Sequence, residues 1–369
     1  QSTPVHSTKK VINRASRQLS LVFIYVFQLL DCAWLAATNL WSINGAPGAQ
    51  PQQMAQLDGG KSPKAADRND EDTARAALFL GFNFLSTVAL ININKYVFTK
   101  AHFGFPAALS NVHYVTSWGC LALLKRLIPA LVPTLDVGRP LHTDRDFLAM
   151  CLLIGSVTPL NNMSLQLNPI AWYQTAKLAV TPVVVAIEYG LDGVVPSAAR
   201  AACLALVCLF VVKMREPAAG GAPQSAAGLI CVAIWVPLAA AYKVQFGRLR
   251  RKLGKCSTLA LMHALFPYAL LVQTILSPLV DPPGLFEYSW TATSVFAVAA
   301  SGLGAFLVNY SGFLVVGHLG AISHVLLGQA KSAMTLLVAA LLFGTSYTAR
   351  ELVCASGAMA SIVAYAYLK

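Results

Sequence analysis

The segment IAWYQTAKLAVTPVVVAIEYG, residues 170–190, places a single lysine, Lys177, well inside an apolar run of the sequence. A helix of this length crosses the bilayer core, which is about 30 Å thick and needs about 20 apolar residues. An ammonium group near the middle of such a helix costs about 2.5–3.5 kcal/mol on insertion scales. The segment therefore predicts a membrane-spanning helix whose lysine faces something other than lipid.

The overall composition extends this interpretation to the whole chain. Hydrophobic residues make up 56% of the 369 residues, charged residues make up 11%, and the mean hydropathy is +0.61. A soluble domain carries about 25% charged residues, so this chain has too few charges to cover a surface that faces water. We expect an all-α membrane protein built from several spanning helices.

The formal net charge of +12 raises nucleic-acid binding as an alternative. The basic residues, however, lie at the ends of apolar runs, as in the cluster Arg248, Arg250, Arg251, Lys252 and Lys255. This placement is typical of residues that set membrane topology. Basic residues interleaved with aromatic residues, as a nucleic-acid surface would need, are absent from the sequence, and we expect no nucleic-acid partner.

The cysteines and the short motifs of the chain indicate neither a cofactor nor an enzyme. The eight cysteines form no CxxC pair and no Cys/His cluster, and all except Cys256 lie in apolar segments. We interpret them as small buried residues and expect no metal site. The sequence also lacks HExxH, GxSxG and Walker motifs, which mark common classes of enzyme.

Residues 1–75 differ from the rest of the chain. An apolar segment at about 19–43 follows several basic residues, and residues 44–75 are rich in Gly, Pro, Gln, Asp and Lys. The apolar segment is compatible with a signal anchor, a transit segment or an extra helix, and the polar stretch with a disordered tail. We favour a further interpretation, in which the natural protein starts at Met54 and the upstream residues are a gene-model artefact.

From residue 76 to residue 367 the apolar runs predict ten spanning helices in two halves, about 76–214 and about 226–367. The expected spans are 76–98, 106–126, 146–163, 170–190, 198–214, 226–246, 258–279, 292–316, 321–343 and 349–367. With ten spans, both ends of this domain lie on the same side of the membrane. The loops on that side hold most of the basic residues, which favours cytosolic ends.

A short internal repeat relates the two halves. The pentapeptide YQTAK at 173–177 in the fourth span matches LGQAK at 327–331 in the ninth, and NMS at 162–164 matches NYS at 309–311. Two halves of five spans each must have opposite orientations in the membrane. Inverted repeats of this kind are typical of secondary carriers, whose binding sites lie at the repeat interface near the bilayer midplane.

Lys177 and Lys331 are the strongest candidates for chemistry in this sequence. Both lie too far inside their spans to reach the membrane surface easily. Two converging ammonium groups in a water-filled cavity suit a dianionic phosphate group. The alternative is a lysine neutralised by a buried carboxylate, for which Glu188 is the main candidate. We expect Lys177 and Lys331 to bind substrate.

Five further residues are candidates for the same site. Tyr173 and Gln174 share a helix face with the lysine of their segment, although core packing explains Tyr173 equally well. Lys243 lies near the end of the sixth span, where it could instead extend to the membrane interface. Asn162 and Asn309 match glycosylation motifs at membrane depth, where a substrate hydrogen bond or polar packing fits better.

These motifs together resemble the nucleotide-sugar transporter and triose-phosphate translocator family of the drug/metabolite transporter superfamily. The resemblance covers about residues 76–367 and rests on NINK at 92–95, NMSL at 162–165, YQTAK at 173–177 and GQAK at 328–331. It implies a transporter domain of ten helices in two inverted halves, which exchanges its substrates by alternating access.

Departures from the family pattern bear on the substrate. In plastid phosphate translocators a lysine matching Lys177, a basic residue matching Lys243 and a Lys-Arg pair grip phosphate, whereas this pair reads Lys331-Ser332 here. Val308 stands where those carriers have a tyrosine. Members with a small residue after the lysine are similar to Golgi and ER nucleotide-sugar transporters, so the resemblance adds Ser332 to the expected site.

The resemblance implies an antiporter that exchanges a nucleotide sugar, UDP-linked, for a nucleoside monophosphate across the Golgi or ER membrane. The alternative is a plastid-envelope translocator of phosphate, triose phosphate or phosphoenolpyruvate, and a membrane enzyme or a non-transporting scaffold is less favoured. The expected partners are the phosphorylated substrates and the lipid bilayer. The sequence leaves open whether the chain forms a homodimer.

Overall fold

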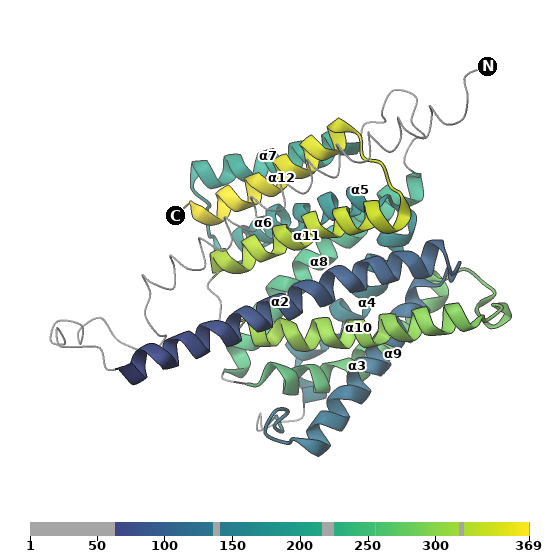
Figure 1. Ribbon diagram of the computed structural model, residues 1–369, viewed down its shortest axis with the longest axis horizontal. Helices are drawn as coiled ribbons and strands as arrows, with labels where there is room; N and C mark the ends of the chain where they lie inside the picture. Colours follow the sequence, from purple (N-terminus) through teal and green to yellow (C-terminus); the bar gives the residue numbers. More distant parts are fainter. Residues whose placement is uncertain (1–62, 136–140, 216–224, 255, 317–320, 369) are drawn as a thin grey trace.

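The computed structural model describes residues 63–135, 141–215, 225–254, 256–316 and 321–368 (Figure 1). Over these ranges the chain is helical, with short connections and no β-strand. The apolar segment expected at 19–43, most of the polar stretch after it and the proposed start at Met54 lie outside the described residues.

Most of the helices match an expected span, and the first, fourth and sixth spans differ the most. Their bounds are α2 Pro63–Thr99, α3 Pro106–Leu127, α4 Arg145–Leu167, α5 Ile170–Ala176, α6 Val180–Asp192, α7 Ala198–Arg215, α8 Ala226–Leu253, α9 Thr258–Val280, α10 Ala292–Val316, α11 Ala321–Phe343 and α12 Ala349–Tyr367. Short 3₁₀ turns lie at Leu141–Thr143 (η1), Lys177–Ala179 (η2) and Leu285–Glu287 (η3).

Helix α2 begins well before the expected start of the first span. Its first residue is Pro63 instead of residue 76, so residues 63–75, which were expected within the disordered tail, are helical. Proline suits the first position of a helix because its fixed backbone angle matches and its missing N–H needs no partner there. The next residues, 64–75, include three Ala, two Arg, one Lys and one Glu, which favour helix over coil.

The fourth expected span, residues 170–190, is not one regular helix. Helix α5 gives way to η2 at Lys177–Ala179, and α6 continues from Val180. Pro182 explains the interruption, because it has no N–H to donate to the carbonyl of Leu178 and its ring crowds that carbonyl. The tighter 3₁₀ turn relieves this conflict. Lys177 therefore lies at a break in a helix, a common feature of functional sites.

The helix ends carry specific polar contacts. The Asp144 carboxylate accepts hydrogen bonds from the backbone N–H groups of Asp146 and Phe147 at the start of α4, at 2.9 and 3.4 Å. Lys252 at the end of α8 forms ion pairs with Asp144, at 3.0 Å, and with Asp146. The hydrogen bond from Lys252 holds the pKa of Asp144 below its usual range.

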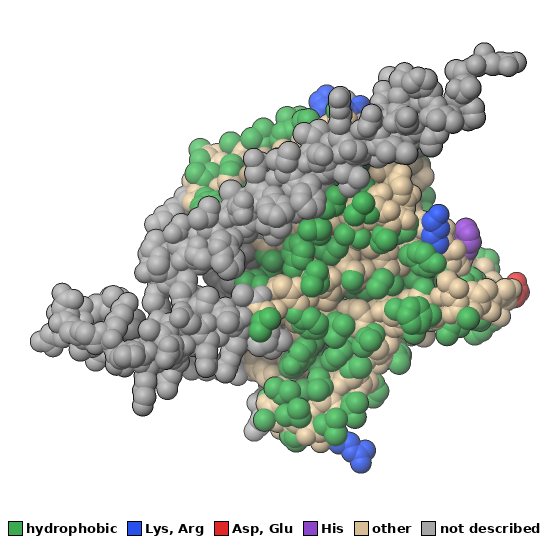
Figure 2. Space-filling model, in the orientation of Figure 1, with side chains coloured by type: hydrophobic (Ala, Val, Ile, Leu, Met, Phe, Trp, Pro, Cys, Tyr) green, Lys and Arg blue, Asp and Glu red, His purple; other side chains and the backbone are tan. Residues whose placement is uncertain are grey.

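The surface of the helices is apolar. Five helices of the described chain are long and apolar enough to cross a membrane, namely Arg145–Leu167, Ile170–Asp192, Ala226–Leu253, Thr258–Val280 and Ala292–Ser311. On α9, Leu271, Ile275 and Leu279 repeat every four residues and are all more than half exposed. Apolar side chains also gather on the part of the face in Figure 2 that is not grey, with Lys and Arg at its edges. These findings confirm an all-α integral membrane protein.

The helices pack in pairs from distant parts of the sequence. Helix α2 packs along α10, α4 along α8, α3 along α9, and α7 along α12 (Figure 1). Glycine permits some of these close approaches: a Cβ atom at Gly155 of α4 would lie 2.8 Å from the backbone oxygen of Ala269 in α9. The Asp281 carboxylate, after α9, accepts hydrogen bonds from the backbone of Ala107 and Ala108 at the start of α3.

Candidate functional site

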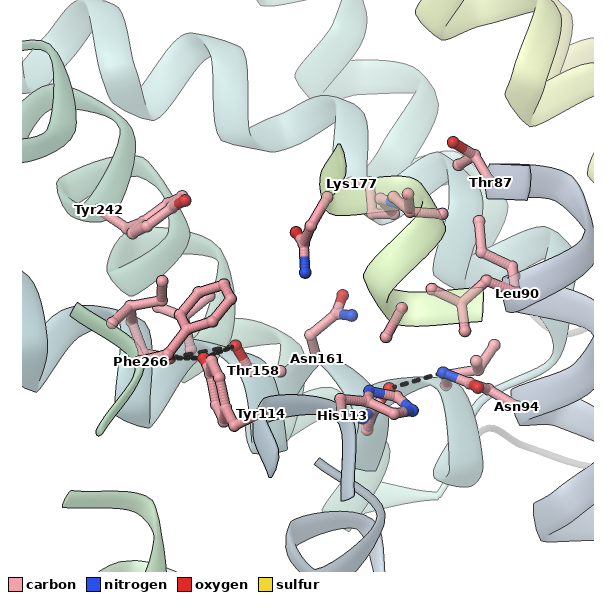
Figure 3. A pocket seen from close by; sticks show the side chains of 18 of the residues that line it. Thr87, Leu90, Asn94, His113, Tyr114, Thr158, Asn161, Lys177, Tyr242 and Phe266 are labelled. Atoms are coloured by element: carbon pink, nitrogen blue, oxygen red, sulfur yellow. Dashed lines mark hydrogen bonds between the residues drawn. The ribbon is translucent and has the colours of Figure 1, made fainter. Parts of the chain in front are cut away.

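A cavity of about 290 Å³ lies among helices from both halves of the chain (Figure 3). Its walls come from α2, α3, α4, α5 with η2, α8, α9 and α10. In Figure 3 the aromatic residues Tyr114, Tyr242 and Phe266 lie on one side, and Thr87 and Asn94 lie on the other. The cavity is thus enclosed by segments that the sequence separates by more than two hundred residues.

Lys177 is a basic residue in the wall of this cavity. Its ammonium lies 5.2 Å from the centre of the Tyr173 ring, in cation–π contact. The described part of the chain gives it no carboxylate and no hydrogen-bond acceptor, and Glu188, the expected alternative partner, forms no ion pair with it. A cation on a cavity wall without a counter-charge favours an anionic ligand.

Lys243 and Lys331 add positive charge around Lys177. Both repel the Lys177 ammonium electrostatically, although neither lines the cavity. Lys243 is exposed, as expected if it extends toward an aqueous boundary. The three lysines proposed from the sequence therefore act on one region of the molecule, but only Lys177 faces the cavity.

Lys331 is held just outside the cavity. Its ammonium donates a hydrogen bond to the side-chain oxygen of Asn83 in α2. Ser332, the next residue of α11, donates its hydroxyl to the Gly328 carbonyl of its own helix at 3.3 Å. The structure thus does not bring Ser332 to the cavity wall.

Tyr173 and Gln174 have different positions although they are neighbours in α5. Tyr173 lines the cavity and donates its hydroxyl to the Asn161 side-chain oxygen at 2.8 Å. Gln174 is fully buried away from the cavity, and neither polar atom of its amide has a hydrogen-bond partner in the described residues. The helix therefore presents Tyr173 to the cavity together with Lys177.

Asn162 and Asn309 both line the cavity. Asn162 belongs to a series of buried hydrogen bonds. Its side-chain oxygen accepts a hydrogen bond from the Asn94 amide at 3.2 Å, and its side-chain nitrogen donates one to the Ser110 hydroxyl at 2.7 Å. Asn309 has no hydrogen-bond partner among the residues described here, so its amide is available to a ligand. Asn162 therefore serves mainly to join α2, α3 and α4.

The same series of hydrogen bonds fixes His113. Ser301 donates its only proton to Asn94 at 2.6 Å, so it must accept a proton from the His113 Nε2 atom, also at 2.6 Å. His113 is on the cavity wall, and its ring is thereby held in one orientation. The hydrogen bond to Ser301 gives this histidine a structural role.

The polar residues in or beside the cavity that the sequence-based site did not include are, among others, Asn83, Asn94 and Asn161. Asn83, Thr87 and Asn94 lie four and seven residues apart, so they form a polar stripe on one face of α2. That spacing is a signal that could have pointed to α2 as a cavity wall. Asn161 had no comparable signal, because its contact with Tyr173 depends on how α4 meets α5.

The described residues contain no group of three or more His, Cys, Asp or Glu side chains that could hold a metal ion. The polar groups of the cavity are amides, hydroxyls, an imidazole and one ammonium. These groups bind oxygen-rich anionic ligands and hydroxylated rings through hydrogen bonds.

The sequence of the chain is similar to the sequences of several known transporters. No protein-family model matches the chain. The chain is 31% identical over 291 residues to nucleotide-sugar uncharacterized transporter 1 of Arabidopsis thaliana, and the alignment covers 78% of this chain and 72% of that protein. It is 25% identical over 292 residues to UDP-xylose transporter 2 of Arabidopsis thaliana, covering 78% of this chain and 80% of that protein.

A solved crystal structure also has a similar fold. It aligns with a TM-score of 0.53 at 15% sequence identity, and the alignment covers 79% of this chain and 96% of that chain. At this identity the likeness concerns the fold alone.

Proposed function

Because the chain belongs to the nucleotide-sugar transporter family, we propose that it exchanges a UDP-linked sugar for a nucleoside monophosphate. The name of the UDP-xylose transporter among its relatives supports the choice of a UDP-sugar. In this proposal Lys177, on the cavity wall, and Lys331, beside it, bind the phosphates, and the other residues of the wall contact the sugar and the base.

The position of Lys177 is the observation that carries this proposal. It lies on a cavity wall, has no anionic partner in the described chain, and is surrounded by the positive field of Lys243 and Lys331. Hydrogen bonds between an ammonium and a phosphate are among the stronger ones in proteins, because both partners are charged. A diphosphate entering the cavity would neutralise this field.

The pairing of helices supports an inverted repeat of two five-helix halves, which we propose as the basis of transport. In such a repeat, α2, α3 and α4 correspond to α8, α9 and α10, the broken span α5–α6 corresponds to α11, and α7 corresponds to α12. The contact of α2 with α10 then has its counterpart in the contact of α8 with α4. The contact of α3 with α10 likewise matches that of α9 with α4. Two equivalent halves around one site suit alternating access by rocking of one half against the other.

We expect exchange instead of one-way transport because of the positive charges of the lysines at the site. A closed, empty carrier would enclose ammonium groups in a dry interior, and burying unpaired charges is costly. A bound phosphate pairs with these charges and lowers that cost. The loaded carrier should therefore change its orientation much faster than the empty one.

We propose the Golgi or ER membrane as the site of action, because the pair Lys331-Ser332 lacks the arginine that the resemblance implies for plastid phosphate translocators. Localisation of a fluorescently tagged full chain tests this part of the proposal. Labelling of Golgi or ER membranes is the expected result, and labelling of the plastid envelope contradicts it.

A panel of substrates tests the proposed specificity. The purified chain is reconstituted into vesicles that contain UMP, GMP or inorganic phosphate, and the uptake of radiolabelled UDP-xylose, UDP-galactose, GDP-mannose and triose phosphate is measured. We expect UDP-sugars to enter vesicles preloaded with UMP. Preferential exchange of triose phosphate for phosphate would overturn the assignment to nucleotide sugars.

A further inference from the structure

Of the two lysines proposed to bind phosphate, Lys331 has a hydrogen-bond partner in the described residues, and Lys177 has only a cation–π contact there. Its ammonium donates to the Asn83 side-chain oxygen, from α11 to α2, across 248 positions of the sequence. The cavity itself is lined by Thr87, one turn after Asn83 on α2, and by Val308 of α10. Lys331 thus lies beside the cavity wall but points at a neutral amide.

The orientation of the Asn83 amide is fixed from both sides. Its nitrogen donates to the Ser311 hydroxyl at 2.8 Å and points to the Val308 carbonyl at 3.5 Å. A carbonyl can only accept a hydrogen bond and an ammonium can only donate one, so the amide oxygen must face Lys331. Asn83 is only 4% exposed, which leaves it little freedom to rotate.

The hydrogen bond between Lys331 and the Asn83 amide is of a kind that a substrate can displace. An amide oxygen satisfies a buried ammonium without cancelling its charge, so the charge stays available to an anion. A carboxylate in the same place would form an ion pair that a phosphate could displace only with difficulty. A hydrophobic residue would leave the ammonium without any partner, which is costly in a low-dielectric interior.

We propose that Asn83 is a positioning residue that holds Lys331 outside the cavity while the carrier is empty. The substrate phosphate must then take Lys331 away from Asn83, and this transfer draws α11 toward the cavity. The transfer links substrate binding to movement of a helix of the second half. This inference rests on the proposed function for the phosphate, whereas the contact between Lys331 and Asn83 is observed directly.

Exchange kinetics test the competition between Asn83 and the substrate. Asn83→Ala frees Lys331, so the KM for UDP-sugar exchange should fall about tenfold, the factor that corresponds to about 1.4 kcal/mol. Asn83→Asp should raise the KM by at least the same factor, because an ion pair replaces the neutral contact. A KM that is unchanged in both variants, or moves in the opposite directions, overturns the proposal.

Ser86→Ala is the matched control. The Ser86 hydroxyl lies 3.3 Å from the Ser311 hydroxyl in the same polar cluster but does not contact Lys331. This variant should therefore keep the wild-type KM. A fall in KM as large as that of Asn83→Ala would assign the effect to loosening of the cluster and overturn the specific role of Asn83.

A measurement on the empty protein separates this inference from the proposed function. The reconstituted full chain is treated, without substrate, with a membrane-permeant amine reagent, and the modification rates of Lys331 and Lys177 are read by mass spectrometry. Asn83→Ala should speed the modification of Lys331 severalfold, Asn83→Asp should slow it, and the rate at Lys177 should not change. Unchanged rates at Lys331 refute the inference, whereas a wild-type chain that exchanges no nucleotide sugar refutes the proposed function alone.

Discussion

At the scale of single residues, two lysines in matching sequence positions have different surroundings. Lys177 lies at a helix break, over the ring of Tyr173, on the cavity wall. Lys331 lies within the continuous helix α11 and is bonded to Asn83. We infer that an arriving phosphate meets Lys177 first and recruits Lys331 second, so that the two lysines contribute to different steps of binding.

Removal of either lysine should strongly reduce exchange while leaving the protein in the membrane. We expect Lys177→Ala and Lys331→Ala each to lower UDP-sugar exchange by roughly 10- to 100-fold, because hydrogen bonds to charged groups contribute about 1.5–3 kcal/mol. Exchange into preloaded vesicles is measured at equal amounts of inserted protein. Lys100→Gln, which alters an exposed lysine beyond the end of α2, should retain full activity. Full activity of Lys331→Ala would remove Lys331 from the site.

At the scale of elements, the start of α4 depends on one carboxylate. Asp144 caps the helix and pairs with Lys252 of α8, and this pair lowers the pKa of Asp144 below its unfolded value. A lowered pKa stabilises the folded state above the unfolded pKa of about 3.9, and the contribution is lost as the pH falls through the lower, folded value.

Asp144→Ala should therefore lower the free energy of unfolding at neutral pH by about 1 kcal/mol, the usual effect of losing a helix cap. The difference from the wild type should shrink below about pH 4, where the unfolded carboxylate becomes protonated. Thermal unfolding in detergent across this pH range measures the effect. A difference that grows on acidification would contradict the assigned role.

Glycines in two helices should respond to the same substitution in opposite ways. A methyl group at Gly155 meets the Ala269 backbone at 2.8 Å, so Gly155→Ala must push α4 away from α9 and should cost about 1–3 kcal/mol. Gly119 in α3 has open space around its Cβ position, so Gly119→Ala should stabilise the helix by about 0.5–1 kcal/mol. The unfolding temperatures of the two variants, compared with that of the wild type, test both predictions. Equal effects would show that the α4–α9 contact is not tight.

Much of the helical framework could be predicted from the sequence, because the start and length of a helix depend on residues that are close together in the sequence. Pro106 opens α3 where the apolar run begins, and apolar length alone located α9 and α10 to within a residue at each end. The early start of α2 was missed because residues 63–75 are polar, and polarity excludes a lipid-facing helix but not a helix. The break at Lys177 was missed because apolar length does not register the effect of Pro182.

The site was predictable only in part, because its contacts depend on how helices are rotated against each other. Lys177 and Tyr173 line the cavity together, as expected for residues that are four apart and share a helix face. The bond between Asn83 and Lys331 joins two elements 248 positions apart, and no local pattern specifies it. For the same reason the sequence could not show that Gln174 faces the packed interior instead of the cavity.

At the scale of the whole molecule, two sets of helices surround one positively charged region. Helices α2, α3 and α4 contribute amides and hydroxyls to the cavity wall, and α8 and α9 contribute aromatic rings. The amino groups of Lys177, Lys243 and Lys331 interact electrostatically across this arrangement. Such a region is costly to close when it is empty, and this cost is why we expect the carrier to exchange substrates rather than release them freely.

The central claim is tested most directly by the uptake of radiolabelled UDP-xylose into reconstituted vesicles that are either empty or preloaded with UMP. We predict rapid uptake into the preloaded vesicles, at least about tenfold slower uptake into the empty ones, and loss of this difference in Lys177→Ala; the factor corresponds to about 1.4 kcal/mol between the barriers of the loaded and the empty carrier. Equal uptake into empty and preloaded vesicles by the wild-type protein would contradict an exchange mechanism built on these lysines.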